Sequence, residues 1–178
     1  MKKQDELSVR ICGIGGQGIV LAGNILAEAL LRNHRYATNS ASYGPEVRGT
    51  SVRSDVLAAQ DWIAYPRAER PDFVIALGQK VYNAGVAEFD KETVVIYDPV
   101  LVRPAPKCPA RHIAVKASQA CLEKFGDNAD VNLVMLGALS SLGVAQTQDL
   151  EAAAVERIRA RDDARRAIAL GRELAAQN

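Results

Sequence analysis

Hydrophobic and polar positions along this chain follow two patterns, short apolar runs and longer stretches with apolar residues every three or four positions. The apolar runs are bounded by glycine, proline or aspartate, as is typical of strands buried on both faces. Strands are expected at residues 8–14, 36–40, 52–57, 73–77, 93–97 and 112–115. Helices are expected at residues 19–33, 79–89, 117–125, 131–142 and 148–176, the last with a break near 161–162. This alternation predicts an α/β, Rossmann-like fold with a mainly parallel sheet flanked by helices and a helical C-terminal tail.

Length and composition narrow the class of protein. The 178 residues suit one domain spanning residues 1–178, and 48% hydrophobic with 24% charged residues is the balance of a globular protein. The 22 basic and 21 acidic residues give a net charge of +1, which argues against nucleic acid as a partner. The start of the chain has no secretory signal pattern, and no apolar run is long enough to span a bilayer. We therefore expect a cytoplasmic protein without a membrane span.

The cysteines do not form a metal-binding pattern. Cys12, Cys108 and Cys121 are far apart and make no CxxC pair or zinc-type spacing. Each is interpreted as a small buried hydrophobic residue, and no metal site is expected in this chain.

Glycines carry the first chemical signal, directly after the first predicted strand. Gly13, Gly15 and Gly18 match GxGxxG at a strand-to-helix junction, and Gly16 adds flexibility. Such a turn lets a phosphate approach backbone N–H groups at the positive end of a helix, although a purely structural turn is the alternative. NAD sites usually have a carboxylate at the end of the second strand, and residues 36–40 have none. Ordinary NAD binding therefore loses support.

A loop expected at residues 41–50 carries the second signal. It concentrates hydroxyl groups, glycines, a proline and the guanidinium of Arg48 at the carboxyl end of a strand, where open α/β sheets bind ligands. Arg48 could bind a phosphate or a carboxylate of another subunit, or it could be an exposed cation without a ligand.

Together these two segments resemble the gamma subunit of the 2-oxoacid:acceptor (ferredoxin) oxidoreductases, the pyruvate/2-ketoisovalerate oxidoreductase family. The resemblance rests on Gly-Ile-Gly-Gly-Gln-Gly at residues 13–18 and Ser-Tyr-Gly-Pro-Glu-Val-Arg-Gly at 42–49, and it extends through the apolar helix at 132–138. It implies one component of a complex that oxidatively decarboxylates a 2-oxoacid and forms an acyl-coenzyme A. Two departures are Thr50, where relatives usually have a second glycine, and residues 167–171, where they tend to have Ala-Phe-x-x-Gly.

The same resemblance implies the distribution of ligands and partners. Thiamine diphosphate, Mg and iron–sulfur clusters are expected in companion subunits of the alpha, beta and delta types. Electrons would pass through the complex to ferredoxin or to an NAD-linked acceptor. This chain would close the active site and help to bind coenzyme A. The candidate binding residues are Gly13, Gly15, Gly16, Gln17, Gly18, Ser42, Tyr43 and Arg48. No catalytic residue is assigned.

Other polar residues favour structural roles. His34 follows a helix end, and His112 begins a strand without an acid or nucleophile near it in sequence. Residues 157–166 form a charge run that is typical of a solvated helix face, with docking on another subunit as the alternative. Trp62 and Tyr65 could pack a loop or a partner. A second function remains open, a stand-alone Rossmann-like nucleotide-binding regulator, but it leaves the 41–50 segment unexplained.

Overall fold

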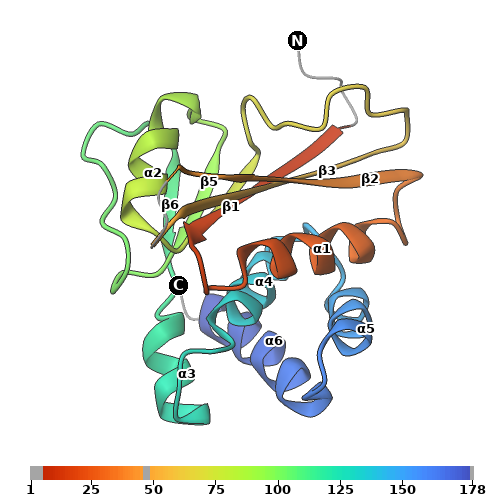
Figure 1. The fold of residues 1–178 in the computed structure, drawn as a ribbon, viewed down its shortest axis with the longest axis vertical. Helices are drawn as coiled ribbons and strands as arrows, with labels where there is room; N and C mark the ends of the chain where they lie inside the picture. The colour runs from red at the N-terminus through yellow and green to blue at the C-terminus, as the bar shows by residue number, and fades with distance from the viewer. Residues whose placement is uncertain (1–5, 46–48, 177–178) are drawn as a thin grey trace.

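The computed structural model describes residues 6–45 and 49–176. Their six strands form one sheet in the order β2-β3-β1-β4-β5-β6. The strands are β1 (Glu6–Ile14), β2 (Tyr36–Tyr43), β3 (Ser51–Ala59), β4 (Phe73–Ala76), β5 (Val94–Tyr97) and β6 (Arg111–Ala114). Figure 1 shows this sheet across the middle of the molecule, with most helices below it.

Strand directions define a mixed, mostly parallel sheet. β1 pairs in parallel with β4, β4 with β5, and β5 with β6. β3 pairs antiparallel with both β1 and β2, so the other five described strands share one direction and β3 opposes them. The predicted Rossmann-like fold is confirmed. Because β1 and β2 run in the same direction, they end at the same margin of the sheet, which we call the carboxyl edge.

Helices cover the two faces unequally. α1, α4, α5 and α6 lie on one face, and α2 lies on the other (Figure 1). The helices are α1 (Ile19–Leu30), α2 (Gln79–Gly85), α3 (Ala117–Phe125), α4 (Val131–Ser140), α5 (Thr147–Arg157) and α6 (Arg161–Ala175). A short 3-10 helix, η1 (Val86–Glu88), ends the crossover after α2, which is shorter than expected. The C-terminal tail is helical as predicted, with its break at 158–160.

The centre of the apolar core is α4. All of its residues are buried, as its uniformly apolar sequence predicted, and it packs against α6. A Cβ atom at Gly171 would overlap Val134 O, and one at Gly137 would overlap Ile168 O. The two helix backbones therefore meet through a pair of glycines.

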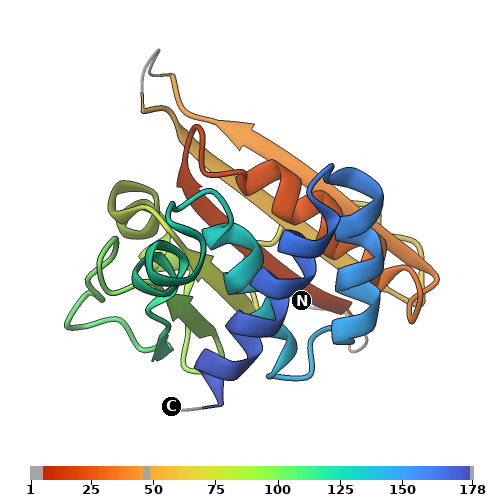
Figure 2. The same ribbon diagram turned by 90° about the horizontal axis from the view of Figure 1, so that it is seen from below.

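The segment after the second strand differs from the expectation. Residues 41–43 continue β2 and pair with β3, Ala41 with Ser54 and Tyr43 with Val52, so the predicted loop 41–50 is shorter. The composition of residues 41–43 resembles that of a loop, but pairing with β3 gives backbone N–H and C=O groups of this segment hydrogen-bond partners. Figure 2 shows the β2–β3 hairpin projecting beyond the rest of the molecule.

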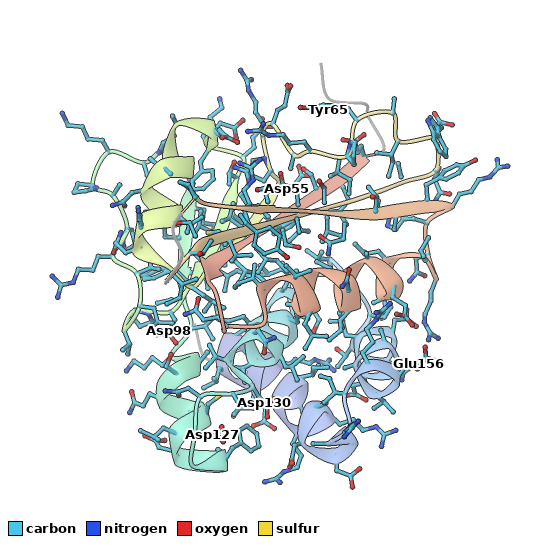
Figure 3. The ribbon with its side chains drawn as sticks, in the orientation of Figure 1. Asp55, Tyr65, Asp98, Asp127, Asp130 and Glu156 are labelled. Atoms are coloured by element: carbon cyan, nitrogen blue, oxygen red, sulfur yellow. The ribbon has the colours of Figure 1, made fainter. Side chains whose placement is uncertain are left out.

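Beneath α2, the sheet carries a buried cluster of ions. Arg10 on β1 is 1% exposed, and its Nε lies 2.9 Å from Asp55 Oδ1 on β3. Arg10 Nη1 lies 2.7 Å from Glu88 Oε2, and its Nη2 donates to Ala68 O. Arg53 also pairs with Asp55 at 3.1 Å, so the four charges balance. Figure 3 shows Asp55 on this face of the sheet, away from α1.

Candidate functional site

The turn between β1 and α1 is a glycine-lined corner at the carboxyl edge. Gly15 and Gly16 are exposed, and Gly16 and Gly18 have φ angles of 93° and 66°. Residues with a Cβ are strained in this left-handed region, which accounts for glycine at both positions. α1 begins directly after Gly18, without a side-chain cap.

Two of the four N–H groups at residues 15–18 are bound within the chain. Gly15 N donates to Thr50 O at 2.9 Å, and Gln17 N donates to Ile14 O at 3.2 Å. Among the described residues, nothing accepts a hydrogen bond from the N–H of Gly16 or Gly18. A helix has further unpaired N–H groups in its first turn, and its dipole is positive there. The corner can therefore hold an anion through backbone donors.

The side chain of Gln17 holds the turn in shape. Its Oε1 accepts from Ile14 N at 2.8 Å, and its Nε2 donates to Leu77 O at 3.0 Å. Both ends of the amide are thus occupied, one within the turn and one at the end of β4. Its predicted contact with a ligand stays a prediction, and these two hydrogen bonds give Gln17 a positioning role.

Gly13 is buried, and its predicted contact with a ligand stays a prediction. A Cβ at this position would overlap the Gln17 Oε1 and Ile19 Cδ1 atoms. A Cβ at Gly78, on the neighbouring β4 end, would lie 3.0 Å from Gly13 Cα. The close approach of these two strand ends allows Gln17 to reach Leu77.

Asn132 is a residue of this region to which sequence reasoning gave no role. It is 5% exposed at the start of α4, and its Nδ2 donates to Gly18 O at 3.1 Å. The same oxygen accepts from Ala22 N at 2.9 Å. A side chain at Gly18 would overlap Asn132 Nδ2, so the turn and α4 are fitted to each other. The signal available in sequence was a polar residue at the head of an otherwise apolar helix.

The hairpin lies directly beside the glycine turn. Thr50, one of the departures noted above, supplies the oxygen that accepts from Gly15 N. Side chains alternate along β2, and Asn39 donates toward α1, so Tyr43 lies on the α1 face while Ser42 lies on the opposite face. Tyr43 is 66% exposed. Arg48 falls outside the described residues, and its role stays a prediction.

A second helix start at the carboxyl edge is closed by the protein itself. Asp98, fully buried after β5, accepts from Ser118 N at 2.6 Å in the first turn of α3 and from Val100 N at 2.9 Å. Figure 3 shows Asp98 just above α3. The start of α1, by contrast, has no side-chain cap hydrogen bond and no acidic residue in its first turn.

The histidines have the structural settings that the sequence favoured. His112 Nε2 lies 2.9 Å from Tyr82 Oη, and Nδ1 lies 2.9 Å from Ala110 O. Burial lowers the pKa of His112, so the neutral ring accepts from the Tyr82 hydroxyl. His34 lies near the end of α1, where its backbone N–H donates to Leu30 O at 2.9 Å.

Thiol and metal chemistry find little support in the described chain. Burial raises the pKa of Cys12 and of Cys121 to about 12, so both stay protonated thiols. Among the described residues, no three His, Cys, Asp or Glu side chains come close enough to hold a metal ion. No described helix has both the length and the apolar character needed to cross a membrane.

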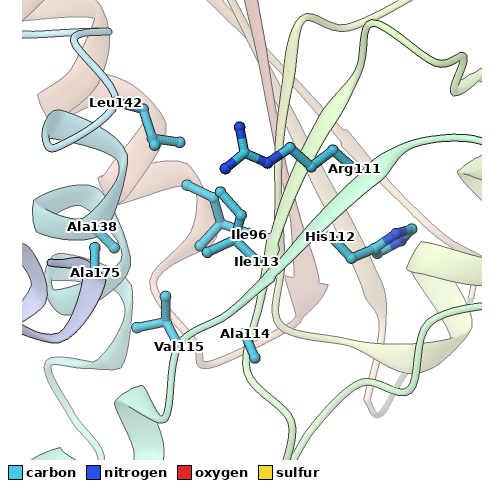
Figure 4. A pocket seen from close by; sticks show the side chains of 9 residues that line it. All are labelled: Ile96, Arg111, His112, Ile113, Ala114, Val115, Ala138, Leu142 and Ala175. Carbon is cyan, nitrogen blue, oxygen red and sulfur yellow. The ribbon is translucent and has the colours of Figure 1, made fainter. Parts of the chain in front are cut away.

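A cavity of about 280 Å³ lies between β6 and the C-terminal ends of α4 and α6. Figure 4 shows Arg111 reaching across it toward Leu142, while His112 points to the other side of the strand. The glycine turn contacts α4 at Asn132, near the other end of that helix. The cavity is therefore separate from the glycine corner.

A strand, an open glycine turn and an uncapped helix at a parallel-sheet edge define a Rossmann-like domain suited to a phosphate group. Residues 8–174 match the family model described as pyruvate ferredoxin/flavodoxin oxidoreductase. The chain is 31% identical over 169 residues to the 2-oxoglutarate synthase subunit KorC of Archaeoglobus fulgidus, covering 95% of this chain and 88% of that protein. The chain therefore belongs to the pyruvate ferredoxin/flavodoxin oxidoreductase family.

Solved structures agree with this assignment. The gamma subunit of a keto/oxoacid ferredoxin oxidoreductase from Geobacter sulfurreducens superposes with a TM-score of 0.83 at 29% identity, covering 97% of this chain and 99% of that one. The 2-oxoglutarate:ferredoxin oxidoreductase of Magnetococcus marinus shares the fold at a TM-score of 0.87 and 21% identity. The superposition covers 99% of this chain and 32% of the longer M. marinus chain.

Within the family, the chain is a gamma-type subunit of a 2-oxoacid:ferredoxin oxidoreductase, a multi-subunit enzyme. The predicted gamma-subunit resemblance is confirmed. The comparisons give no support to the alternative of a stand-alone regulator.

Proposed function

We propose that this subunit binds the pyrophosphate of coenzyme A at the glycine corner and closes one side of the active site of its complex. The reaction would convert a 2-oxoacid and coenzyme A into an acyl-coenzyme A and CO₂, with two electrons and a proton released to the acceptor side. The M. marinus enzyme that shares this fold was solved with coenzyme A and succinyl-CoA bound. Binding of coenzyme A is a property of the M. marinus enzyme, and it supports testing coenzyme A as a ligand of this chain.

The observation that carries the proposal is the pair of unoccupied donors at Gly16 and Gly18. Their N–H groups have no acceptor among the described residues, and they lie at the uncapped start of α1. Pyrophosphate oxygens are strong acceptors, and glycine allows them to approach the backbone closely. Together with the unpaired N–H groups of the first turn of α1, these two donors can bind several oxygens of a diphosphate, whereas a carboxylate offers only two oxygens.

Exposed apolar side chains surround the same edge. Ile14, at the end of β1, is 40% exposed, and Val100, after β5, is 69% exposed. Tyr43, at the end of β2, is also exposed at this edge. Exposed apolar side chains suit contact with the pantetheine arm of coenzyme A and with a companion subunit.

The companions would hold the remaining groups. Thiamine diphosphate supplies carbanion stabilisation for decarboxylation, and the iron–sulfur clusters carry electrons to ferredoxin or another acceptor. This chain's own part is to bind and orient coenzyme A and to exclude water from its side of the site. Ser42, Tyr43 and Arg48 stay candidates for contacts at the subunit boundary.

Gly16→Ala in the assembled complex tests the proposal. A Cβ at Gly16 meets nothing within 4 Å, so the substitution adds a methyl group and left-handed strain without an internal clash. We expect the KM for coenzyme A to rise at least about tenfold, or ~1.4 kcal/mol. Decarboxylation measured without coenzyme A should keep its rate.

Gly126→Ala is the matched control. Gly126 also has a positive φ, 84°, and open space around its Cβ position, but it ends α3 instead of starting α1. It should lose comparable stability and leave the KM for coenzyme A unchanged. An unchanged KM for coenzyme A in Gly16→Ala would place the coenzyme A phosphates elsewhere.

A further inference from the structure

β2 is an edge strand whose outer side has no partner among the described strands. It is eight residues long, and its pairing with β3 runs without a bulge from Tyr36–Ala59 to Tyr43–Val52. Its sequence, YATNSASY, contains no charged residue and no proline. Natural sheet edges usually carry charges, prolines or bulges that prevent pairing with another chain, and β2 has none of these.

The hydrogen bonds to β3 determine which backbone groups point outward. Gly44 N donates to Ser51 O at 2.7 Å, so the even-numbered residues of β2 exchange hydrogen bonds with β3. The N–H and C=O groups of Ala37, Asn39, Ala41 and Tyr43 therefore face away from the sheet. Within residues 6–45 and 49–176, no hydrogen bond reaches these outward backbone groups. These groups form a regular row of donors and acceptors, free within the described chain, along the outer edge of β2.

We propose that β2 pairs antiparallel with β2 of a second copy of this chain, about a two-fold axis at Ser40. In this register Ala37 faces Tyr43 of the second copy and Asn39 faces its Ala41. Every outward residue then meets an outward residue of the other copy, and each such pair exchanges two hydrogen bonds. A register centred on Asn39 would leave Tyr43 without a partner inside β2. The axis at Ser40 therefore uses the edge most fully.

Side chains fit the same register. On the α1 face, Tyr43, 66% exposed, faces the small Ala37. On the other face of the sheet, Tyr36 faces Gly44 and Thr38 meets Ser42, a cross-strand hydroxyl pair of a favourable kind. The strand is uncharged, so identical copies meet without like-charge repulsion along it, and the two-fold axis closes the assembly as a dimer. Figure 2 shows β2 along the outer margin of the molecule, where a second copy can approach.

Disulfide cross-linking tests the register. In a Cys108→Ser background, which removes the partly exposed thiol, Ser40→Cys places two thiols opposite each other. Non-hydrogen-bonded antiparallel pairs have Cα atoms about 4.5 Å apart, within the range of a disulfide. We expect a covalent dimer under mild oxidation. Ser42→Cys is the matched control and should stay monomeric on a non-reducing gel, whereas an equal mixture of Thr38→Cys and Ser42→Cys chains should cross-link.

Sedimentation equilibrium tests the dimer itself. The wild-type chain should reach twice its mass of 19.1 kDa as concentration rises. Ala41→Pro removes an outward N–H that β3 does not use, so it should raise the dimer dissociation constant at least tenfold while the circular dichroism spectrum is retained. Ala41→Lys should do the same if the proline variant misfolds, and Ala41→Ser should leave dimerisation unchanged.

Three outcomes would overturn the proposal. One is a single 19.1 kDa species at every concentration, and another is equal cross-linking of the Ser40→Cys and Ser42→Cys variants. The third is slow amide exchange at Ala41 and Tyr43 that appears only in the complex with companion subunits, which would make a companion strand the occupant of this edge.

Discussion

Gln17 occupies the middle of the glycine turn, yet its side chain serves the fold. Its amide joins Ile14 N to Leu77 O and so fixes the end of β1 against the end of β4. Asn132, at the start of α4, holds the other end of the turn by donating to Gly18 O. The open donors at Gly16 and Gly18 are therefore held in a defined direction by two amide side chains.

Gln17→Leu should lower the free energy of unfolding by about 1–3 kcal/mol, since it leaves Ile14 N and Leu77 O without their partner. Urea titration followed by circular dichroism measures this change. Gln119→Leu is a suitable control, because the Gln119 amide binds only the exposed Glu123 side chain. A Gln17→Leu chain as stable as the control would show that the turn holds its shape without the amide.

The buried setting of His112 predicts a pH dependence of stability. Burial lowers the pKa of His112 below its ordinary value of 6.5, so between the two pKa values the unfolded chain binds more protons than the folded chain. Stability should therefore fall as pH is lowered from 6.5 through the folded pKa, and be insensitive to His112 above that window. His112→Gln removes this titration, so its unfolding free energy should decline less between about pH 7.5 and about pH 5. Equal declines in both chains would contradict the assignment.

The sequence predicts a glycine turn at a strand-to-helix junction, but it does not predict the hydrogen bonds that the Gln17 and Asn132 amides make. Spacing and context are enough for Gly15, Gly16 and Gly18, because the motif is local. The bonds of Gln17 to Leu77 and of Asn132 to Gly18 join segments 60 and 114 residues apart, and no local pattern encodes such a contact. Gly13 was expected as a ligand contact, and its burial beneath Gln17 depends on the same distant packing.

Between elements, the tightest contact is the crossing of α4 and α6. Gly137 and Gly171 each lie against the backbone of the opposite helix, so no Cβ fits at either position. A larger side chain at either position would therefore push α4 and α6 apart.

Gly171→Ala should destabilise the fold by about 2–5 kcal/mol, because the new methyl group would overlap Val134 O and force the helices apart. Differential scanning calorimetry measures the loss. Gly85→Ala is the comparison within another helix, since the nearest atom, at the tip of the Phe89 ring, lies 3.3 Å away and can move. We expect a smaller loss there, and similar losses at both sites would argue against a backbone-to-backbone contact.

Helices with a strong hydrophobic period are predicted well from the sequence, whereas the pairing of one strand with another is not. The helical period of α1 and the apolar sequence of α4 fix their type and approximate length. Residues 41–43 looked like loop because hydroxyl groups, glycines and a proline are concentrated over residues 41–50. Their pairing with residues 52–54 depends on a hairpin. The antiparallel direction of β3 could not be predicted either. Alternation of apolar and polar residues indicates which face of the sheet a side chain lies on, but it does not indicate the direction of the strand.

Across the whole molecule, apolar side chains pack on both faces of the sheet, and the face under α2 carries a buried ion cluster as well. The larger apolar cluster lies under α1, α4, α5 and α6, whereas a smaller one lies under α2 beside the Arg10 cluster. Arg10 links β1 to β3, to η1 and to Ala68 in the segment after β3. The sequence shows Arg10 as a single cation in an apolar strand, where exposure would be expected. Arg10 is buried because Ala68 and Glu88, 58 and 78 positions further along the chain, pack over it.

Arg10→Leu should destabilise the protein by about 3–5 kcal/mol, because Asp55 and Glu88 would stay in place with Arg53 as their one remaining cation in the cluster. Removing Asp55 as well restores the balance, since Arg53 and Glu88 are left as one pair of opposite charge, 3.7 Å apart. The double variant Arg10→Leu/Asp55→Leu should therefore be more stable than Arg10→Leu alone, although it has lost more polar contacts. A double-mutant cycle by urea unfolding measures this coupling. Additive losses would mean that hydrogen bonds to the backbone, such as the one to Ala68 O, carry the effect of Arg10 and that charge balance does not.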